Sequence, residues 1–407
     1  MIRHQIYFDT LGSIREDSAS WRSVFAGLSV LRLVDAYAQQ GSTTPNWAHL
    51  HSVRAAIEEM SDGDVIRGVL TNLLEEMTSR TTIDDSVHVA LLGYGRALDY
   101  EASWGLATDV FATVAKLVKP ERNARLAVEA NVAVGGAARR NGDWETSARA
   151  YSQAAYIADT LGDHPGVLTV QVGIANTYFA KGNLPQAQLI LDDVIVQARD
   201  QSLPEIQGMA LHSRAAIATG RGEHAEGLKL AYEALGLISK SSDKDQVLGD
   251  IAGMFTTLGM HDSARDAHLI LAATAQTKFV RWSATLNLME LAGLDGMEEQ
   301  FDTYANELAR APIGVWVRSH YLLFLGEGFH RFARQDAAIE ALEQAVDFAE
   351  ANQIHHIAFK AQDALARVRS APRAVPNFTP PPAWLPDDVG TVVRAISELR
   401  VAALAAA

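Results

Sequence analysis

Apolar residues recur every three or four positions along most of the chain, and this spacing predicts amphipathic helices rather than strands. The first such stripe follows Ser18, whose hydroxyl suits the N-cap of a helix running to about residue 40. Further helices are predicted to begin near Pro45 and Val65. Only Ile2–Phe8 alternates apolar and polar residues, which predicts one short strand.

From about residue 84 the helical segments come in pairs, and the pairs repeat. A small residue separates the two helices of each pair, namely Gly142, Gly182, Gly222, Gly259, Gly296 and Ala333. The differences between these numbers are 40, 40, 37, 37 and 37 residues. A slim residue stands seven positions before each marker, Met289 excepted, and a small one five positions after it, Phe301 excepted. Such positions, of which Gly326 and Ala338 are one pair, predict close contact between two helices, because larger side chains would separate them.

This pattern resembles the tetratricopeptide repeat over roughly residues 122–350, and an earlier degenerate unit is expected around Leu92 and Trp104–Phe111. The longer units are similar to the extended repeats of bacterial regulators that sense peptides or sugars. The resemblance implies an all-α, right-handed superhelical solenoid of antiparallel helix pairs. In that family the first (A) helices of the pairs line a concave groove, and the second (B) helices lie outside.

The changes in pattern divide the chain into four parts. We expect an N-terminal helical cap at 1–80, an array of about six repeats at 81–370, a proline-rich linker at 371–387 and a C-terminal amphipathic helix at 388–407. The linker assignment rests on six prolines, Pro372, Pro376, Pro380, Pro381, Pro382 and Pro386.

Composition narrows the function classes. The net charge is −14 and no run of basic residues occurs, which argues against a nucleic-acid partner. There are no cysteines, so disulfides and thiolate metal sites are excluded. No signal-peptide pattern is visible and no apolar run approaches the ~20 residues of a membrane span. We therefore expect a cytoplasmic protein that contacts no membrane.

No sequence motif indicates an enzyme, a cofactor or a metal site: phosphate-binding, dinucleotide-binding, nucleophile-elbow and zinc-protease signatures are absent. His261 and His268 share a helical face, but they occupy repeat positions that are aromatic elsewhere, at Trp144 and Tyr151, so we interpret them as packing residues. Carboxylate pairs such as Glu298-Glu299 are interpreted as solvated helix-face charges.

The concave groove is the predicted binding surface. Counting from the marker residues, the A-helix positions that face it carry Glu129, Arg139, Arg140, Asn176, Phe179, His212, Gln246, Glu290, His320, Glu327, His330 and Arg331. Members of the family that bind chaperones hold a peptide carboxylate with Lys and Asn at set positions. Asn176 matches one of them, but Val132 stands where the lysine is needed, so that clamp is incomplete.

The sequence therefore predicts a non-catalytic scaffold or adaptor that holds a protein or peptide partner in this groove. The alternative is a ligand- or peptide-responsive regulatory protein whose repeats close around a small ligand. Small residues in the middle of the groove, among them Gly136, Ala216 and Gly253, suit an amphipathic helix lying close against it. That helix is either a partner's or the chain's own C-terminal helix, which also offers a route to a homodimer.

Overall fold

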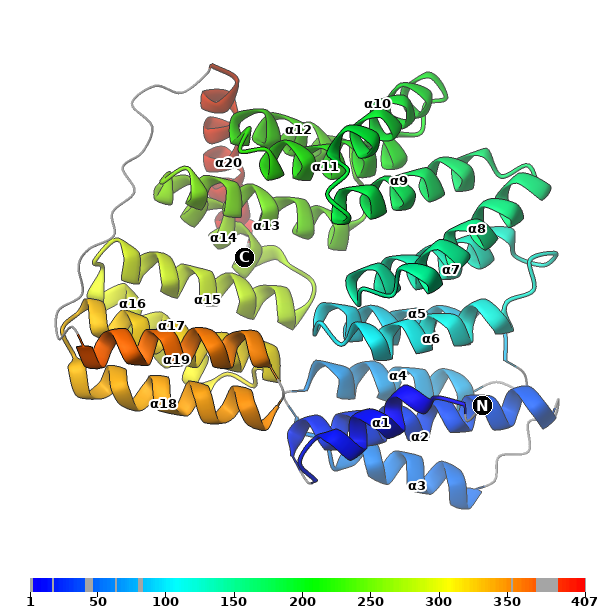
Figure 1. Cartoon of the computed structure of the whole chain (residues 1–407), viewed down its shortest axis with the longest axis horizontal. Helices are drawn as coiled ribbons and strands as arrows, with labels where there is room; N and C mark the ends of the chain where they lie inside the picture. Colours follow the sequence, from blue (N-terminus) through cyan, green and yellow to red (C-terminus); the bar gives the residue numbers. More distant parts are fainter. Residues whose placement is uncertain are drawn as a thin grey trace. The chain divides into compact units, whose positions relative to one another are not determined.

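The structure is a computed structural model that describes residues 3–16, 18–40, 47–62, 64–79, 83–352, 354–370 and 387–406. Within these ranges every regular element is an α-helix (Figure 1), which confirms the predicted all-α class. Residue Pro45 and the linker residues 371–386 lie outside the described ranges. Among the described helices none is both long and apolar enough to cross a membrane.

The chain divides into two compact units, Met1–Ala180 and Lys181–Ala407. The helices of the first unit are α1 (Gln5–Ser13), α2 (Ala19–Gln40), α3 (Trp47–Glu58), α4 (Val65–Thr78), α5 (Asp85–Tyr100), α6 (Trp104–Leu117), α7 (Ala124–Arg140), α8 (Trp144–Thr160) and α9 (His164–Ala180). Those of the second are α10 (Leu184–Asp200), α11 (Pro204–Gly220), α12 (His224–Leu237), α13 (Ser241–Thr257), α14 (His261–Thr274), α15 (Lys278–Leu294), α16 (Glu298–Arg310), α17 (Val315–Arg331), α18 (Gln335–Ala351), α19 (His355–Ser370) and α20 (Asp387–Ala406).

The predicted N-terminal strand is wrong, because residues 5–13 form helix α1. Its packing explains the difference. Tyr7 is fully buried and its hydroxyl lies 3.0 Å from that of Tyr94 on α5. His4 precedes the helix, and its Nδ1 lies 2.5 Å from the Asp109 carboxylate on α6. A period of two over so few residues is weak evidence, and the contacts of α1 with α2 and α6 decide the conformation.

Each marker residue stands just after an A helix and has a left-handed backbone conformation. The φ angles of Gly142, Gly182, Gly222, Gly259, Gly296 and Ala333 lie between 59° and 79°. This backbone region turns the chain within three residues, and glycine adopts it without a steric penalty. Ala102 has the same conformation, with φ 56°, and stands 40 residues before Gly142. The degenerate early unit is thus a helix pair, α5 with α6.

The two helices of a pair touch where the sequence places small residues. A Cβ atom at Gly326 would lie 2.5 Å from Leu342 Cγ and 3.2 Å from the carbonyl oxygen of Ala338. At Gly227 it would lie 3.3 Å from the carbonyl oxygen of Ala215. The prediction that these positions are slim because the backbones approach is therefore confirmed.

The pair α15–α16 has large residues at the two contact positions that are small in other pairs. A glycine in the next pair, on α17, leaves room for one of them. Met289 and Phe301 are both fully buried, although other pairs have small residues there. Room for the Phe301 ring comes from Gly328 on α17, where any Cβ would overlap the ring. The rings of Phe329 and Phe332 pack on its other sides, with centroids at 5.9 and 5.3 Å.

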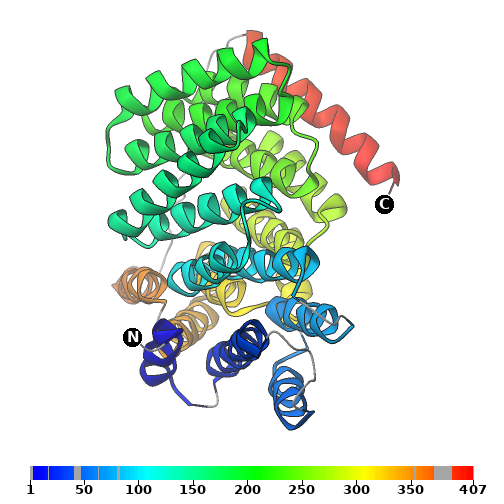
Figure 2. The ribbon, with the colours of Figure 1, turned by 90° about the vertical axis from the view of Figure 1, so that its right-hand side faces the viewer.

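The C-terminal helix α20 packs on B helices. It contacts α14 and α12 (Figures 1 and 2, in red) and buries Val389, Val392 and Ile396. The C-terminal helix is one of the two occupants that the sequence suggests for the groove. In the structure it does not lie on the A-helix positions.

Replacing Gly328 by alanine is expected to destabilise the protein by about 1–3 kcal/mol, because the new methyl group overlaps Phe301 in a filled core. Gly253 on α13 is the matched control, since a Cβ there meets nothing within 4 Å. Gly253→Ala should stabilise the helix by roughly 0.5–1 kcal/mol. Chemical denaturation of both variants measures the difference, and equal effects would contradict the packing described here.

Candidate functional site

Three predicted groove residues of the first unit lie on α7, and two of them tie α7 to the preceding A helix. Glu129 pairs with Arg96 of α5. Arg140 donates through Nε to Asp99 Oδ1 at 2.8 Å and also pairs through Nη2. These charges are therefore engaged within the protein.

The other three residues of the first unit are less constrained. Arg139 lies beside Tyr151, and burial lowers the pKa of its guanidinium below the ordinary value, although Tyr151 opposes that shift. Its Nε is buried without a hydrogen-bond partner. Asn176 and Phe179 lie half-buried on α9, which packs against α7.

In the second unit three of the predicted groove residues lie apart from one another, and the other four lie together. His212 of α11 lies 2.6 Å from the Asp250 carboxylate of α13 and links these A helices. Gln246 is exposed on α13. His330 of α17 is half-buried, with Nδ1 unpartnered. The remaining four, Glu290, His320, Glu327 and Arg331, lie on α15 and α17 and contribute to two neighbouring groups of side chains.

The first group, the aromatic cluster, consists of Phe279, Trp316, His320, Phe324 and His356. Phe279 and Trp316 have ring centroids 5.6 Å apart, and Trp316 and His320 4.0 Å apart. His320 also lies 6.2 Å from Phe324 and 5.9 Å from His356 of α19. Its Nδ1 is 3.0 Å from the Trp316 carbonyl oxygen. Burial lowers the pKa of His320 below 6.5, the Trp316 carbonyl opposes this, and His356 and Lys360 lower it further, so the imidazole is largely neutral at pH 7.

The second group, the charged ladder, consists of Glu290, Glu327, Arg331, Lys360 and Arg367. Glu327 is its centre, because its carboxylate lies 3.3 Å from Arg367 Nη2 and 3.9 Å from Arg331 Nη2. Burial raises the pKa of Glu290 from 4.5 to about 7, and the negative charge of Glu327 adds to this. Arg331 and Lys360 act in the opposite direction without cancelling the burial effect.

The ladder follows the repeat. Phe279 and Trp316 stand 37 residues apart, as do Glu290 and Glu327, so equivalent positions of α15 and α17 carry similar chemistry. Helix α19 continues the series with a spacing of 40, which relates Glu327 to Arg367. The same spacing relates Trp316 to His356 and His320 to Lys360. The α19 residues could not be predicted from the marker residues, because no marker residue follows that helix. The 40-residue spacing of the first repeats was the signal that would have found them.

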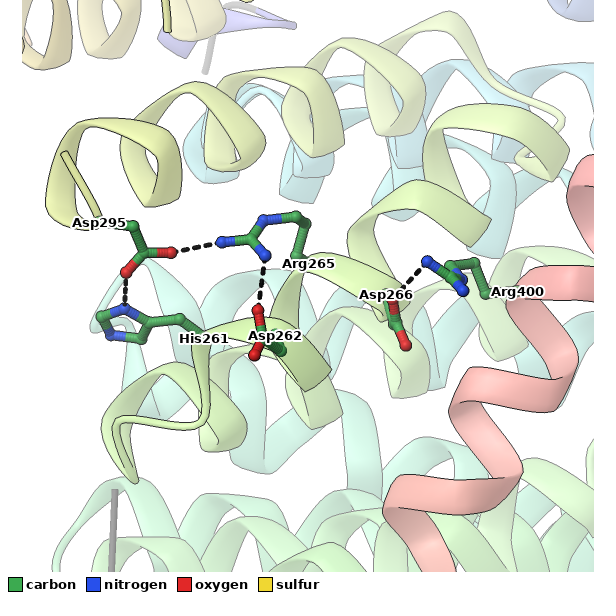
Figure 3. Close-up of polar contacts among 6 residues, drawn as sticks. All are labelled: His261, Asp262, Arg265, Asp266, Asp295 and Arg400. Atoms are coloured by element: carbon green, nitrogen blue, oxygen red, sulfur yellow. Dashed lines mark hydrogen bonds and ion pairs between the residues drawn. The ribbon is translucent and has the colours of Figure 1, made fainter. Parts of the chain in front are cut away.

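The two histidines considered as metal ligands are used in packing. His261 begins α14, and its Nδ1 lies 2.5 Å from Asp295, the C-cap residue of α15 (Figure 3). Arg265 pairs with the same carboxylate and, at 2.7 Å, with Asp262. His268 is buried, and burial lowers its pKa to about 4. No group of three His, Cys, Asp or Glu residues suited to a metal ion occurs in the described part of the chain.

A serine and a histidine stand close together within the aromatic cluster without forming an accessible catalytic pair. Ser319 Oγ lies 3.5 Å from His320 Nδ1. However, Ser319 is fully buried and its hydroxyl donates to the Trp316 carbonyl at 2.7 Å. A nucleophile must reach a substrate and be hydrogen-bonded to its base. The cluster and the ladder therefore offer ring faces, a neutral imidazole and charges of both signs, which are groups suited to binding.

The raised pKa of Glu290 predicts a pH dependence of stability. Between pH 4.5 and about 7 the folded state binds more protons at this carboxyl than the unfolded state, so its contribution to stability falls as the pH rises through that window. Glu290→Gln mimics the neutral form and should be more stable than wild type at pH 8, by on the order of 1–3 kcal/mol, since each pKa unit corresponds to about 1.4 kcal/mol.

The two proteins should converge near pH 5 in urea denaturation. Glu340→Gln, at an exposed position of the B helix α18, is the matched control and should show no such trend. A Glu290→Gln variant that is no more stable than wild type at pH 8 would contradict the assigned protonation.

No protein-family model matches the chain, and no curated protein matches it in sequence. Several solved structures resemble the chain, and some of them are described as containing tetratricopeptide repeats. NprR in complex with its cognate peptide NprX is 12% identical, with 85% of this chain and 92% of that chain covered and a TM-score of 0.44. A Rap protein complexed with Competence and Sporulation Factor is 12% identical, covering 86% and 98%, with a TM-score of 0.34.

A third similar structure, described as nearly identical TPR-like repeats of a kinesin light chain from Podosopora anserina, is 15% identical over 47% of this chain and 95% of that chain, with a TM-score of 0.37. Identities and TM-scores this low assign no function. The architecture rests on the chain's own geometry: left-handed marker residues, slim contact positions and helices that pack in sequence within each unit. The chain is an all-α protein of tetratricopeptide-like helix pairs.

Proposed function

We propose that this protein is a non-catalytic scaffold that binds a peptide or an extended protein segment on the A-helix face of α15, α17 and α19. The observation that carries the proposal is the alignment of equivalent side chains across three neighbouring A helices. The aromatic cluster and the charged ladder run across the same helices, so a bound segment that crosses them meets both groups.

The spacing of the helices suits an extended chain. Packed helices lie roughly 8–10 Å apart. An extended peptide advances about 3.3 Å per residue, so every third residue meets the next A helix. Contacts join α15 to α17 and α17 to α19, so the three form a continuous row. A segment of about seven residues therefore spans the row, with the side chains of its alternate residues facing the helices.

The chemistry of the face defines the segment. Trp316 and His320 present two rings in contact, tilted by 32°, which favour an aromatic or aliphatic side chain as the anchor. Glu290 and Glu327 lie beside Arg331 and Lys360, so the ladder can pair with a charged side chain of the segment. A cation placed against Glu290 would restore its ionised form, and binding would then release a proton.

Selection from a displayed library of random dodecapeptides on the full chain tests this proposal. Enriched peptides are expected to combine an aromatic residue with a charged residue a few positions away. Trp316→Ala and Glu327→Gln should each weaken the binding of an enriched peptide about tenfold or more, as central interface residues do. Calorimetric titration measures the change.

Two control variants match these substitutions elsewhere. Trp144→Ala on α8 and Glu340→Gln on α18 make the same chemical changes on B helices and should alter the affinity less than twofold. Equal losses in the test and control variants would refute the assignment of the face. Stabilisation of the chain by a small molecule, with no peptide enriched, would favour the alternative of a regulator that closes around a small ligand.

A further inference from the structure

The contact between α20 and the rest of the second unit has an ion pair near each end of the helix, with opposite charges on α20 at the two ends. Asp388 at the start of α20 lies 3.2 Å from Lys229 of α12, and Arg400 lies 3.2 Å from Asp266 of α14 (Figure 3). These two residues of α20 are twelve positions apart, or about 18 Å along a helix. The acidic first turn also suits the positive end of the helix dipole. We call the surface of α12 and α14 with Lys229 and Asp266 the α20 dock.

The apolar part of this contact is small. Val389, Val392 and Ile396 follow the i, i+3, i+7 spacing and are at most 2% exposed. By contrast, α17 has seven buried residues. Further along α20 apolar side chains stay uncovered, with Leu399 44%, Val401 60% and Leu404 50% exposed. Helix α20 thus holds to the array through one short stripe and two ion pairs, and it retains an apolar surface that the described part of the chain does not cover.

The attachment of α20 to the array is long enough for exchange. Sixteen residues, 371–386, separate the end of α19 from the start of α20, and six of them are proline. Such a length of chain reaches at most about 55 Å. Exchange of an identical element between two copies keeps every contact of the closed form, so its cost is low. The balance between the closed and exchanged forms then depends on protein concentration.

We propose that the α20 dock also receives α20 from a second copy of this chain, so that two copies exchange their C-terminal helices reciprocally. The exchanged form brings the uncovered residues Leu399, Val401 and Leu404 of each α20 beside a second chain, where they can be buried. The proposal does not depend on the peptide-binding face of α15, α17 and α19.

Charge reversal on the full chain distinguishes α20 bound to its own dock from α20 bound to the dock of a second copy. One variant carries a reversed dock, Lys229→Glu with Asp266→Arg, and a second carries a reversed helix, Asp388→Lys with Arg400→Glu. In either variant alone both ends of α20 meet like charges, within one chain and between two identical chains. In a mixture each dock meets a complementary helix only on the other variant.

Sedimentation velocity measures the outcome. We expect each variant alone to be monomeric, the equimolar mixture to form a one-to-one dimer, and the chain with all four changes to behave as wild type. Arg394→Glu makes the same change of charge at an exposed position of α20 outside the dock, and should leave the wild-type distribution unchanged.

Two results would overturn the proposal. One is a mixture that stays monomeric at every concentration at which the chain is soluble, while circular dichroism shows both variants folded. The other is a dimer formed equally well by either variant alone, which would place the association on another surface.

Discussion

Close contact of two helix backbones at small residues, as in the pairs α11–α12 and α17–α18, is the constraint on which the rest of this protein depends. Gly326 against Ala338, and Ala215 against Gly227, allow no side chain between the helices. The left-handed residue that follows each A helix then reverses the chain, so that the B helix runs back along the A helix. Because both features recur, equivalent residues of neighbouring pairs are brought to equivalent positions.

The candidate site is a consequence of that recurrence. Glu290 and Glu327 come together because they hold the same position in α15 and α17, and burial beside Glu327 raises the pKa of the Glu290 carboxyl to about 7. The pair α15–α16 shows how the frame tolerates exceptions, since Phe301 enters a normally small position only where Gly328 leaves room. The charged ladder thus lies next to this exceptional contact, since a Cβ atom at Gly293 would lie within 4 Å of both Phe301 and Arg331.

The sequence was sufficient for features that repeat, and insufficient for contacts made once. The markers and the slim positions could be predicted because each occurs several times with one spacing. The engagement of Glu129 by Arg96 and of Arg140 by Asp99 could not, since a single ion pair leaves no periodic trace. Helix α19 lacks a following marker, so Lys360 and Arg367 were missed. The strand prediction for residues 2–8 failed because burial of Tyr7 against α5 outweighs a short alternation.

The side chain of Asp295 couples two successive helix pairs of the second unit, and this coupling affects the order in which the pairs unfold. Asp295 is the C-cap residue of α15, and its carboxylate pairs with His261 and Arg265 of α14, so it joins two successive pairs by charge as well as by apolar packing (Figure 3). In a linear array, unfolding spreads from the ends and stops where the coupling between neighbours is strongest. Fraying that begins at α19 should therefore be slowed twice, first where Arg334 pairs with Glu298 and Asp302 of α16 and then at Asp295, so that the pairs before α15 open last.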